Sequence, residues 1–202
     1  NPVEQGGEGT YPLPEAQLDR FGIMIDLPYI PREQSVKLIL DDSVDDDDWY
    51  KVIEKVAHID EIAKLRKDIR SGIYCSQAAA EYINDLVEAT RPGEPGYKAL
   101  VKKLGNQDES QKFQAALKEG ESLGGSPRPM KVLLNLARIR AWHQGREYIL
   151  PEDIQFVVDP VLKHRLMLSR AAKMKKVPAS SVIKTIVANV DVVTDPNSFK
   201  RG

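Results

Sequence analysis

Apolar residues recur every three or four positions along most of the chain after Pro28, which is the spacing that places them on one face of a helix. We expect helices to begin near Glu15, Pro31, Trp49, Asp60, Ser76, Ser126, Pro151 and Ser169, with one or two polar helices in residues 97–120. Two short pieces between helices, Ile73–Cys75 and Tyr148–Ile149, are predicted to be extended. The pattern therefore predicts a mainly α protein.

The residues at the ends of these stretches support the assignment. Ser126 and Pro127 are typical of a helix start, a capping serine followed by proline at the first position. Ser76 is predicted to cap the helix that follows it, and Gly145 is typical of a helix end. Pro160 predicts a bend in the helix that begins near Pro151.

A different pattern occurs near the N-terminus. Residues Phe21–Leu27 form a short apolar run between turn residues, which is typical of one buried strand. A lone strand leaves its backbone groups unpaired, and no hairpin partner is visible nearby. The run, together with the absence of an initiator methionine, predicts that the chain is part of a longer protein that supplies a sheet.

The composition is that of a globular protein. Of the 202 residues, 42% are hydrophobic and 29% are charged, which disfavours a disordered chain. The single cysteine, Cys75, excludes a disulfide scaffold and is expected to be a buried thiol. The chain contains no apolar run of the roughly 18 residues that a membrane span requires, and its first residues lack the features of a signal peptide. We therefore expect a cytoplasmic protein without a membrane span.

Charge is distributed unevenly along the chain. Residues 1–60 contain 14 acidic and 5 basic side chains, whereas residues 126–202 contain 6 acidic and 14 basic side chains. Within the basic part, residues 163–176 carry six Lys or Arg and no acid, which would suit nucleic-acid binding. Larger apolar side chains lie among these bases, namely Leu166, Met167, Leu168 and Met174, so we favour a packed helix with a solvated basic face over nucleic-acid binding.

Several kinds of site are excluded. No glycine–lysine pair occurs, so the chain has no phosphate-binding P-loop. His58, His143 and His164 lie far apart and lack the spacing of metal ligands. The six aspartates in residues 41–48 lack the spacing of a calcium loop and are interpreted as a solvated acidic loop. We expect no metal site and no complete active site in this chain.

Two arginines are candidate anion-binding residues. Arg20 directly precedes the predicted strand, so its fork of donors can project from the edge of a sheet; an ion pair with Asp19 or Asp26 is the alternative. Arg128 lies in the first turn of a predicted helix, where a cation is unfavourable unless an anion such as a phosphate lies between. The alternative for Arg128 is an ordinary exposed arginine.

Two groups of segments resemble a known family. One is Asn1–Gln5 followed by Gly9–Phe21; the other is Gly125–Arg128, Gly145–Ile154 and Val161–Leu166. In order and content they resemble the segment after the Walker B strand and the lid domain of the MoxR family of AAA+ ATPases. The resemblance covers most of the chain.

The resemblance implies roles for three residues. Asn1 matches sensor 1, which contacts the γ-phosphate or orients the attacking water, and Arg20 matches the arginine finger, which enters the neighbouring subunit's site. Arg128 matches sensor 2, which the lid carries onto the phosphates. The whole protein would bind ATP and Mg²⁺, form a hexameric ring and remodel or mature partner proteins in a chaperone-like manner, often with proteins that carry a von Willebrand factor A domain.

The same resemblance divides the chain. Residues 1–30 would be the end of an α/β core, and residues 31–202 a helical lid with an insertion at about 92–124. The Walker A and Walker B segments are not in this chain, so by itself it is expected neither to bind ATP tightly nor to hydrolyse it. The alternatives are a related AAA+ clade, such as the magnesium-chelatase ATPase subunit, and a free-standing helical interaction module.

Overall fold

The structure, a computed structural model, describes residues 13–40, 53–105, 108–192 and 196–200. Asn1 and the aspartate run lie outside the described residues. The chain forms two units: unit 1 contains the described residues up to Met24 and from Ile69 onward, and unit 2 is Ile25–Asp68.

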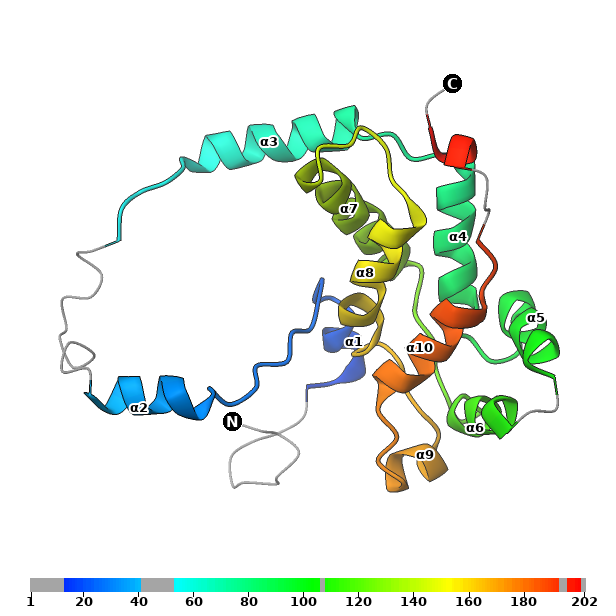
Figure 1. Cartoon of the computed structure of the whole chain (residues 1–202). Coiled ribbons are helices and arrows are strands. Elements are labelled where there is room, and N and C mark those ends of the chain that lie inside the picture. The colour runs from blue at the N-terminus through cyan, green and yellow to red at the C-terminus, as the bar shows by residue number, and fades with distance from the viewer. Residues whose placement is uncertain (1–12, 41–52, 106–107, 193–195, 201–202) are drawn as a thin grey trace. The chain divides into compact units, whose positions relative to one another are not determined.

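Unit 1 is a cluster of packed helices (Figure 1). Its helices are α1 (Glu15–Leu18), α4 (Gln77–Glu88), α5 (Pro95–Leu104), α6 (Asp108–Ala116), α7 (Arg128–His143), α8 (Pro151–Leu162), α9 (Arg170–Met174), α10 (Ala179–Asn189) and a 3-10 turn, η4 (Pro196–Phe199). The α7 helix packs against α8 and α4, and α10 packs against α8, α5 and α6. The prediction of a mainly α protein is confirmed.

The core of unit 1 is built from the apolar helix faces that the spacing predicts. Five side chains without solvent exposure are Leu86 on α4, Leu133 on α7, Ile154 and Leu162 on α8, and Ile186 on α10. Burial of one such side chain is worth roughly 1.5–3 kcal/mol. The core therefore fixes α7 and α8 against each other, and these are the two helices on which the candidate site depends.

The helix ends agree in part with the sequence pattern. Ser76 caps α4 as predicted, because its Oγ accepts the backbone N–H of Ala79 at 3.1 Å. The α7 helix begins at Arg128, slightly later than expected, but the Oγ of Ser126 still accepts the Arg128 N–H at 3.2 Å. Gly145 follows α7 with φ +70°, a conformation that favours glycine.

The two predicted extended pieces lie side by side. Tyr74 and Tyr148 form an isolated parallel bridge, in which the N–H of Ile149 donates to the Tyr74 carbonyl at 3.1 Å. A second isolated bridge, antiparallel, joins Leu123 to Met167. The prediction is confirmed at Tyr74 and Tyr148, which form the bridge, whereas Ile73 lies in a bend and neither piece forms a full strand.

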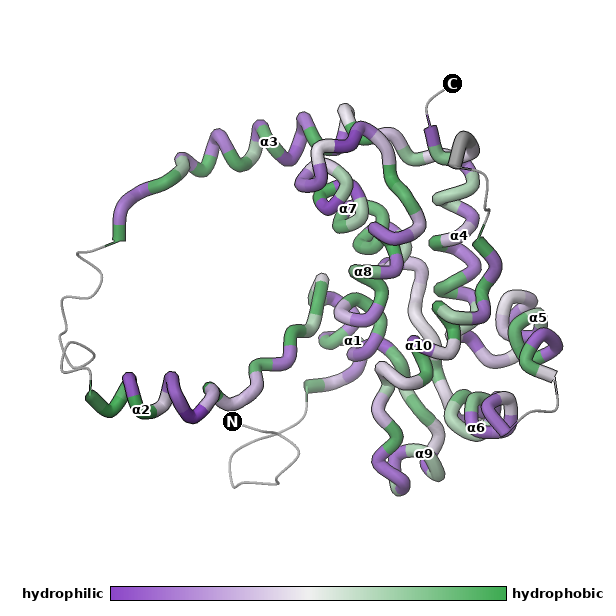
Figure 2. The backbone as a smooth tube through the Cα atoms, in the orientation of Figure 1, coloured by the Kyte–Doolittle hydropathy of each residue, from purple (hydrophilic) through white to green (hydrophobic). Residues whose placement is uncertain are grey.

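Unit 2 contains α2 (Arg32–Leu40) and the greater part of α3 (Ile59–Gly72). Hydrophobic and hydrophilic residues alternate along α3 (Figure 2), as the spacing of Ile62 and Leu65 predicts. The prediction of a helix near Trp49 is wrong for its described part, because residues 53–58 are neither helix nor strand. The described apolar side chains of this unit are all exposed, so this short stretch has no tertiary packing to stabilise a helix.

The strand predicted at Phe21–Leu27 does not form in the described structure. Residues 19–22 make a turn and bend, and residues 23–31 are neither helix nor strand. Met24 donates its backbone N–H to the Pro160 carbonyl at 2.8 Å, but a ladder needs a neighbouring strand, which the described residues do not provide. The run is apolar as a strand would be, yet its side chains are exposed, up to 90% for Leu27.

Candidate functional site

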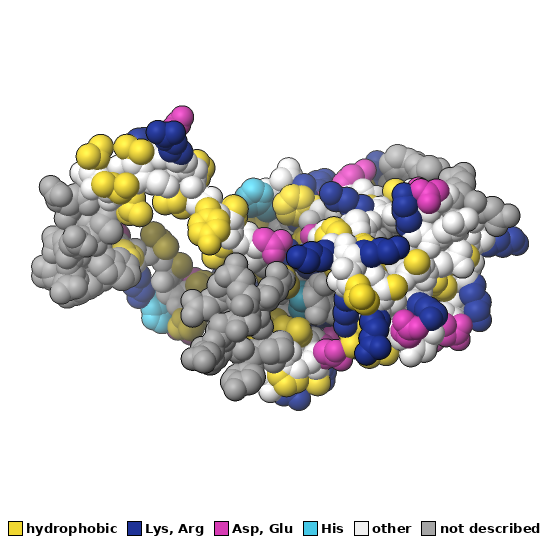
Figure 3. Space-filling model, turned by 90° about the horizontal axis from the view of Figure 1, so that it is seen from below, with side chains coloured by type: hydrophobic (Ala, Val, Ile, Leu, Met, Phe, Trp, Pro, Cys, Tyr) yellow, Lys and Arg dark blue, Asp and Glu magenta, His cyan; other side chains and the backbone are white. Residues whose placement is uncertain are grey.

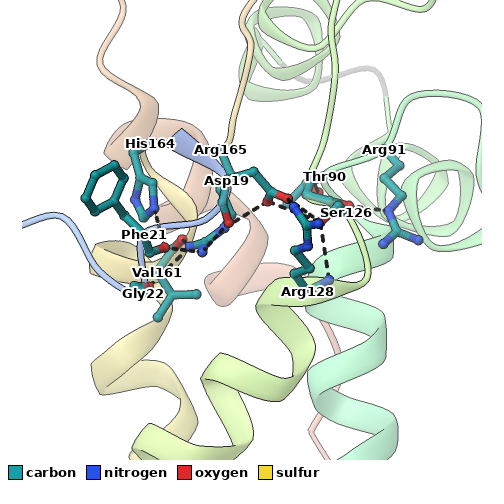
Figure 4. A network of polar contacts seen from close by, with 11 residues as sticks. Asp19, Phe21, Gly22, Thr90, Arg91, Ser126, Arg128, Val161, His164 and Arg165 are labelled. Carbon is teal, nitrogen blue, oxygen red and sulfur yellow. Dashed lines mark hydrogen bonds and ion pairs between the residues drawn. The ribbon is translucent and has the colours of Figure 1, made fainter. Parts of the chain in front are cut away.

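The candidate site lies where three segments of unit 1 meet: the turn after α1, the start of α7 and the end of α8 (Figure 4). The turn forms because the backbone N–H groups of Arg20 and Phe21 donate to the carbonyls of Gln17 and Leu18 at 3.0 and 3.1 Å. This local bonding leaves Asp19 half-buried and the next residue, Arg20, exposed.

Arg165 is the buried centre of the site, with a side chain that is 2% exposed. Its guanidinium donates to Asp19 Oδ1 at 3.2 Å and to the backbone carbonyls of Asp19 at 3.1 Å, Gly22 at 3.3 Å and Phe21. It also donates to the carbonyl of Val161 on α8. A buried charge is costly unless it is paired and hydrogen-bonded, and these acceptors meet that requirement.

Asp19 connects this buried arginine to the start of α7. The Oγ of Ser126 donates to Asp19 Oδ1 and Oδ2 at 3.1 and 3.0 Å, and Arg128 donates to Oδ2 at 3.1 Å. Burial acts to raise the pKa of the Asp19 carboxyl, but hydrogen bonds from Ser126, Arg128 and Arg165, with the charge of Arg165, outweigh it and hold this pKa below its usual value. The site therefore favours the charged carboxylate.

The loop that leads into α7 is fixed by the end of α4. Thr90 Oγ1 accepts the N–H of Gly125 at 2.9 Å, and Arg91 Nε donates to the Gly125 carbonyl at 2.6 Å. At Gly124 an added Cβ would lie 2.3 Å from the Thr90 carbonyl oxygen, so the close approach of the two segments requires glycine. These contacts hold the backbone that presents Ser126.

The structure locates two of the three predicted site residues. Arg128 lies in the first turn of α7 with a 61% exposed side chain, and the anion beside it is the Asp19 carboxylate. Arg20 is exposed, and its side chain makes no ion pair or hydrogen bond with any described residue, so the alternative pairing with Asp19 or Asp26 is not formed. Asn1 lies outside the described residues. The catalytic roles of all three stay predictions.

Sequence reasoning missed Asp19 and Arg165 as site residues. A signal for Arg165 is present, because it lies between Leu162 and Leu166, both of which are buried. An arginine flanked by core residues faces the interior and needs a carboxylate or carbonyl partner. The sequence does not indicate that this partner is Asp19, which lies 146 positions away.

The basic cluster at residues 163–176 does not form a uniformly basic surface. Arg165 is buried, and so are Leu166 and Leu168, although Met174 is 80% exposed. On the face shown in Figure 3, Lys and Arg side chains lie among acidic and hydrophobic ones. The predicted packing and solvated basic face agree with this arrangement, but the predicted helix is limited to α9 (Arg170–Met174), and residues 163–169 are not helical.

Two further titratable side chains are partly buried. His164 Nε2 lies 3.2 Å from the Phe21 carbonyl oxygen, and burial, together with the charge of Arg165, lowers the pKa of this histidine. Cys75 is half-buried rather than fully buried, and burial raises the pKa of its thiol. Both groups are thereby favoured in their neutral forms.

Acid is expected to loosen the turn after α1. The folded-state pKa of Asp19 lies below its unfolded value of about 3.9, so its contribution to stability is complete above that value and is lost as the pH falls through the folded pKa. Hydrogen exchange of the Met24 amide, corrected for intrinsic rates, should rise on acidification by up to about tenfold per unit of pKa shift. Asp19→Asn cannot ionise, and an unchanged pH dependence in this variant would contradict the assignment.

The arrangement is suited to bind an anion. The start of α7 carries the positive end of the helix dipole, and the exposed guanidinium of Arg128 lies in the same turn. Pro127 and Pro129 have no N–H, and the N–H of Arg128 is bonded to Ser126, so the guanidinium is the donor group for an anion here. Within the described residues, no group of three or more His, Cys, Asp or Glu is placed to hold a metal ion. No helix in the described part of the chain has both the length and the apolarity to cross a membrane.

Comparison with protein families gives a match over part of unit 1. Residues 114–186 match the family described as AAA lid domain. The matched segment contains α7, α8 and α9 and therefore both Arg128 and Arg165. Two of the three segments that form the candidate site thus lie within the lid match.

Individual proteins are similar over nearly the whole chain. The chain is 30% identical to chaperone MoxR1 of Mycobacterium tuberculosis, over 94% of this chain and 44% of that protein. It is 32% identical to protein MoxR of Paracoccus denitrificans, over 87% of this chain and 49% of that protein. A crystal structure of a "putative ATPase" from Cytophaga hutchinsonii superposes with a TM-score of 0.76 at 30% identity, over 96% of this chain and 52% of that one. The chain spans about half the length of these relatives.

Proposed function

We propose, from the premise that this chain is a MoxR-like protein with an AAA lid domain, that it works as part of an AAA+ ATPase that remodels partner proteins. The observation that carries the proposal is the position of Arg128: it lies at the start of α7, within the lid match, exposed beside a single carboxylate. A relative named as a chaperone and a neighbour named as an ATPase support the two halves of the proposal.

In this proposal two arginines contact the nucleotide from different subunits. Arg128 acts as sensor 2 and meets the phosphates of its own subunit, exchanging the Asp19 carboxylate for phosphate oxygens. Arg20 acts as an arginine finger in the site of the next subunit of a ring, and its exposed side chain, which makes no ion pair with a described residue, suits that role. Such a finger stabilises charge that develops on the transferred phosphoryl group. Asn1 would act as sensor 1.

The nucleotide needs groups that this chain does not carry. The start of α7 fits phosphate oxygens, because the Arg128 guanidinium offers donors there and the helix dipole adds positive potential. Bound Mg²⁺ would neutralise phosphate charge, and its ligands would come from the rest of the protein, since no described cluster of this chain fits a metal. Residues 1–30 then belong to the core, residues 31–202 to the lid and residues 92–124, with α5 and α6, to an insertion.

A second candidate is a helical interaction module that works without ATP hydrolysis. The sequence lacks a P-loop, and unit 1 has a continuous core of its own, which favours this reading for the chain taken alone. Under both proposals the partners are proteins. Partners with a von Willebrand factor A domain are proposed only under the first, because the resemblance to the MoxR family implies them.

ATP hydrolysis separates the two candidates. We expect the protein expressed with its native upstream sequence to hydrolyse ATP, with a specific activity that rises with protein concentration as subunits assemble. This chain alone, at matched concentrations, is the control and should show no turnover. A longer protein that contains a P-loop but shows no ATP hydrolysis at any concentration would contradict the ATPase proposal and leave the interaction module.

A further inference from the structure

The turn that carries Arg20 is held by a side chain from the far end of the chain. Arg165 donates to carbonyls on both sides of Arg20, those of Asp19 at 3.1 Å, Phe21, and Gly22 at 3.3 Å. Arg20 itself is exposed, and none of the hydrogen bonds that Arg165 makes with described residues goes to the Arg20 side chain. The contacts therefore fix the backbone before and after Arg20, while its side chain is exposed and is not bonded to the described part of the chain.

An arginine is required for this set of bonds. A guanidinium presents five N–H groups in a planar fork, whereas an ammonium presents three donors at a single point. The acceptors lie on two segments, the turn after α1 and Val161 of α8, so the fork bridges them from a fixed position. Because the side chain is 2% exposed, water does not replace a bond that is lost.

The carboxylate of Asp19 is bonded both to Arg165 and to Arg128. Asp19 Oδ1 accepts from Arg165 at 3.2 Å, and Oδ2 accepts from Arg128 at 3.1 Å. The residue next to the exposed Arg20 is therefore bonded to Arg128, the residue proposed to contact phosphate at the start of α7. A change in the partner of Arg128 alters the bonding of Asp19 directly.

We propose that Arg165 is a positioning residue that holds the turn presenting Arg20, and that Asp19 makes this hold sensitive to what Arg128 binds. The role of Arg20 and Arg128 in this statement rests on the proposed function. The hold itself is a property of this chain, so it is testable without nucleotide.

The rate of trypsin cleavage after Arg20 measures how firmly Arg165 holds the turn, because the protease can cleave only when the turn opens. We expect Arg165→Lys to speed release of the peptide 1–20 at least about tenfold, since several charge-assisted hydrogen bonds are lost. Arg138→Lys is the matched control. Arg138 is partly buried and donates its Nε to the backbone carbonyl of Ile73 at 3.2 Å, and it makes no hydrogen bond to the described residues of the turn. Cleavage in this control should stay within about twofold of the parent chain.

Hydrogen exchange shows whether a variant has merely unfolded. Amides of α7 and α8 should keep their protection in Arg165→Lys while the Met24 amide, which donates to Pro160, exchanges faster. If α8 also loses protection, Arg165→Lys has disturbed the fold, and Asp19→Asn becomes the test variant. Asp19 is the more exposed partner of the ion pair, with a 20% exposed side chain, so its replacement disturbs the fold less. Cleavage after Arg20 at the control rate in a folded Arg165→Lys chain, or in Asp19→Asn, overturns the proposal.

In the longer protein the positioning role has a kinetic signature. Arg165→Lys should lower kcat for ATP at least about tenfold with little change in KM, and Arg138→Lys should lower neither. If the parent protein hydrolyses no ATP, the proposed function is contradicted, but the trypsin-cleavage result for Arg165 is unaffected. Hydrolysis that is normal in Arg165→Lys would instead overturn the positioning role alone.

Discussion

Replacement of Arg20 by alanine in the protein with its upstream sequence should lower ATP hydrolysis by about 10³–10⁵-fold, the range found for arginine fingers. The side chain is exposed, and it makes no bond with the described residues of its own chain, so its removal costs little folding energy. The loss should therefore appear in kcat rather than in thermal stability. A Michaelis–Menten analysis beside a urea titration of each variant separates the two effects.

Two further variants sharpen this test. Arg20→Lys keeps the charge but loses the planar fork, so an intermediate rate is expected. Arg32→Ala removes an exposed arginine from α2 and serves as the matched control with unchanged hydrolysis. A finger acts in the neighbouring site, so mixing Arg20→Ala with parent subunits should disable parent sites as well. Hydrolysis that is indifferent to Arg20 would contradict the finger assignment.

Local sequence signals predict the helices of unit 1 well. The spacing of Leu86, Leu133 and Ile154 places each on a helix face, and the structure buries all three. Ser76 and Gly145 mark their helix ends because capping and positive φ depend on single residues. Such signals are readable because the interactions behind them span only a few positions.

The errors occur where structure depends on a partner. Residues 21–27 have the composition of a strand, but a strand forms only beside another. Among the described residues, Met24 to Pro160 is a single backbone bond to a distant segment and not a ladder. The stretch near Trp49 has helical spacing, yet its described part is exposed and not helical. In both cases the sequence pattern indicates an apolar face, but it does not show whether another segment packs against that face.

The candidate site shows the same limit in electrostatics. The unfavourable position of Arg128 predicts an anion beside it, and the structure supplies one, but it is the carboxylate of Asp19. The partner of Arg165 could not be found from spacing, because 146 positions separate the two residues. Sequence patterns can thus indicate that a charge needs a partner, whereas the identity of that partner depends on the fold.

Asp153→Ala should be the most destabilising single change among the charged residues of unit 1, at about 3–5 kcal/mol. The Asp153 side chain is 1% exposed and binds Arg146 through both oxygens, at 2.6 and 2.7 Å. It also accepts the backbone N–H of Leu150 at 2.9 Å, at the residue that precedes α8. Its removal leaves the half-buried Arg146 guanidinium without its carboxylate and the start of α8 without its cap.

Matched variants separate these two contributions to the free energy of unfolding. Glu152→Ala removes the neighbouring carboxylate, which is exposed in the same first turn of α8, and should cost less than about 1 kcal/mol. The double change of Asp153→Ala with Arg146→Met removes both charges of the closest ion pair, so it should recover part of the loss. Recovery should be incomplete, because Arg140, 3.6 Å from Asp153 Oδ1, also loses its carboxylate. Urea unfolding of the three variants measures each cost. Equal destabilisation by Glu152→Ala and Asp153→Ala would show that the interaction with the helix dipole dominates. The buried ion pair would then not be what stabilises the start of α8, the helix that leads into Arg165 at its other end.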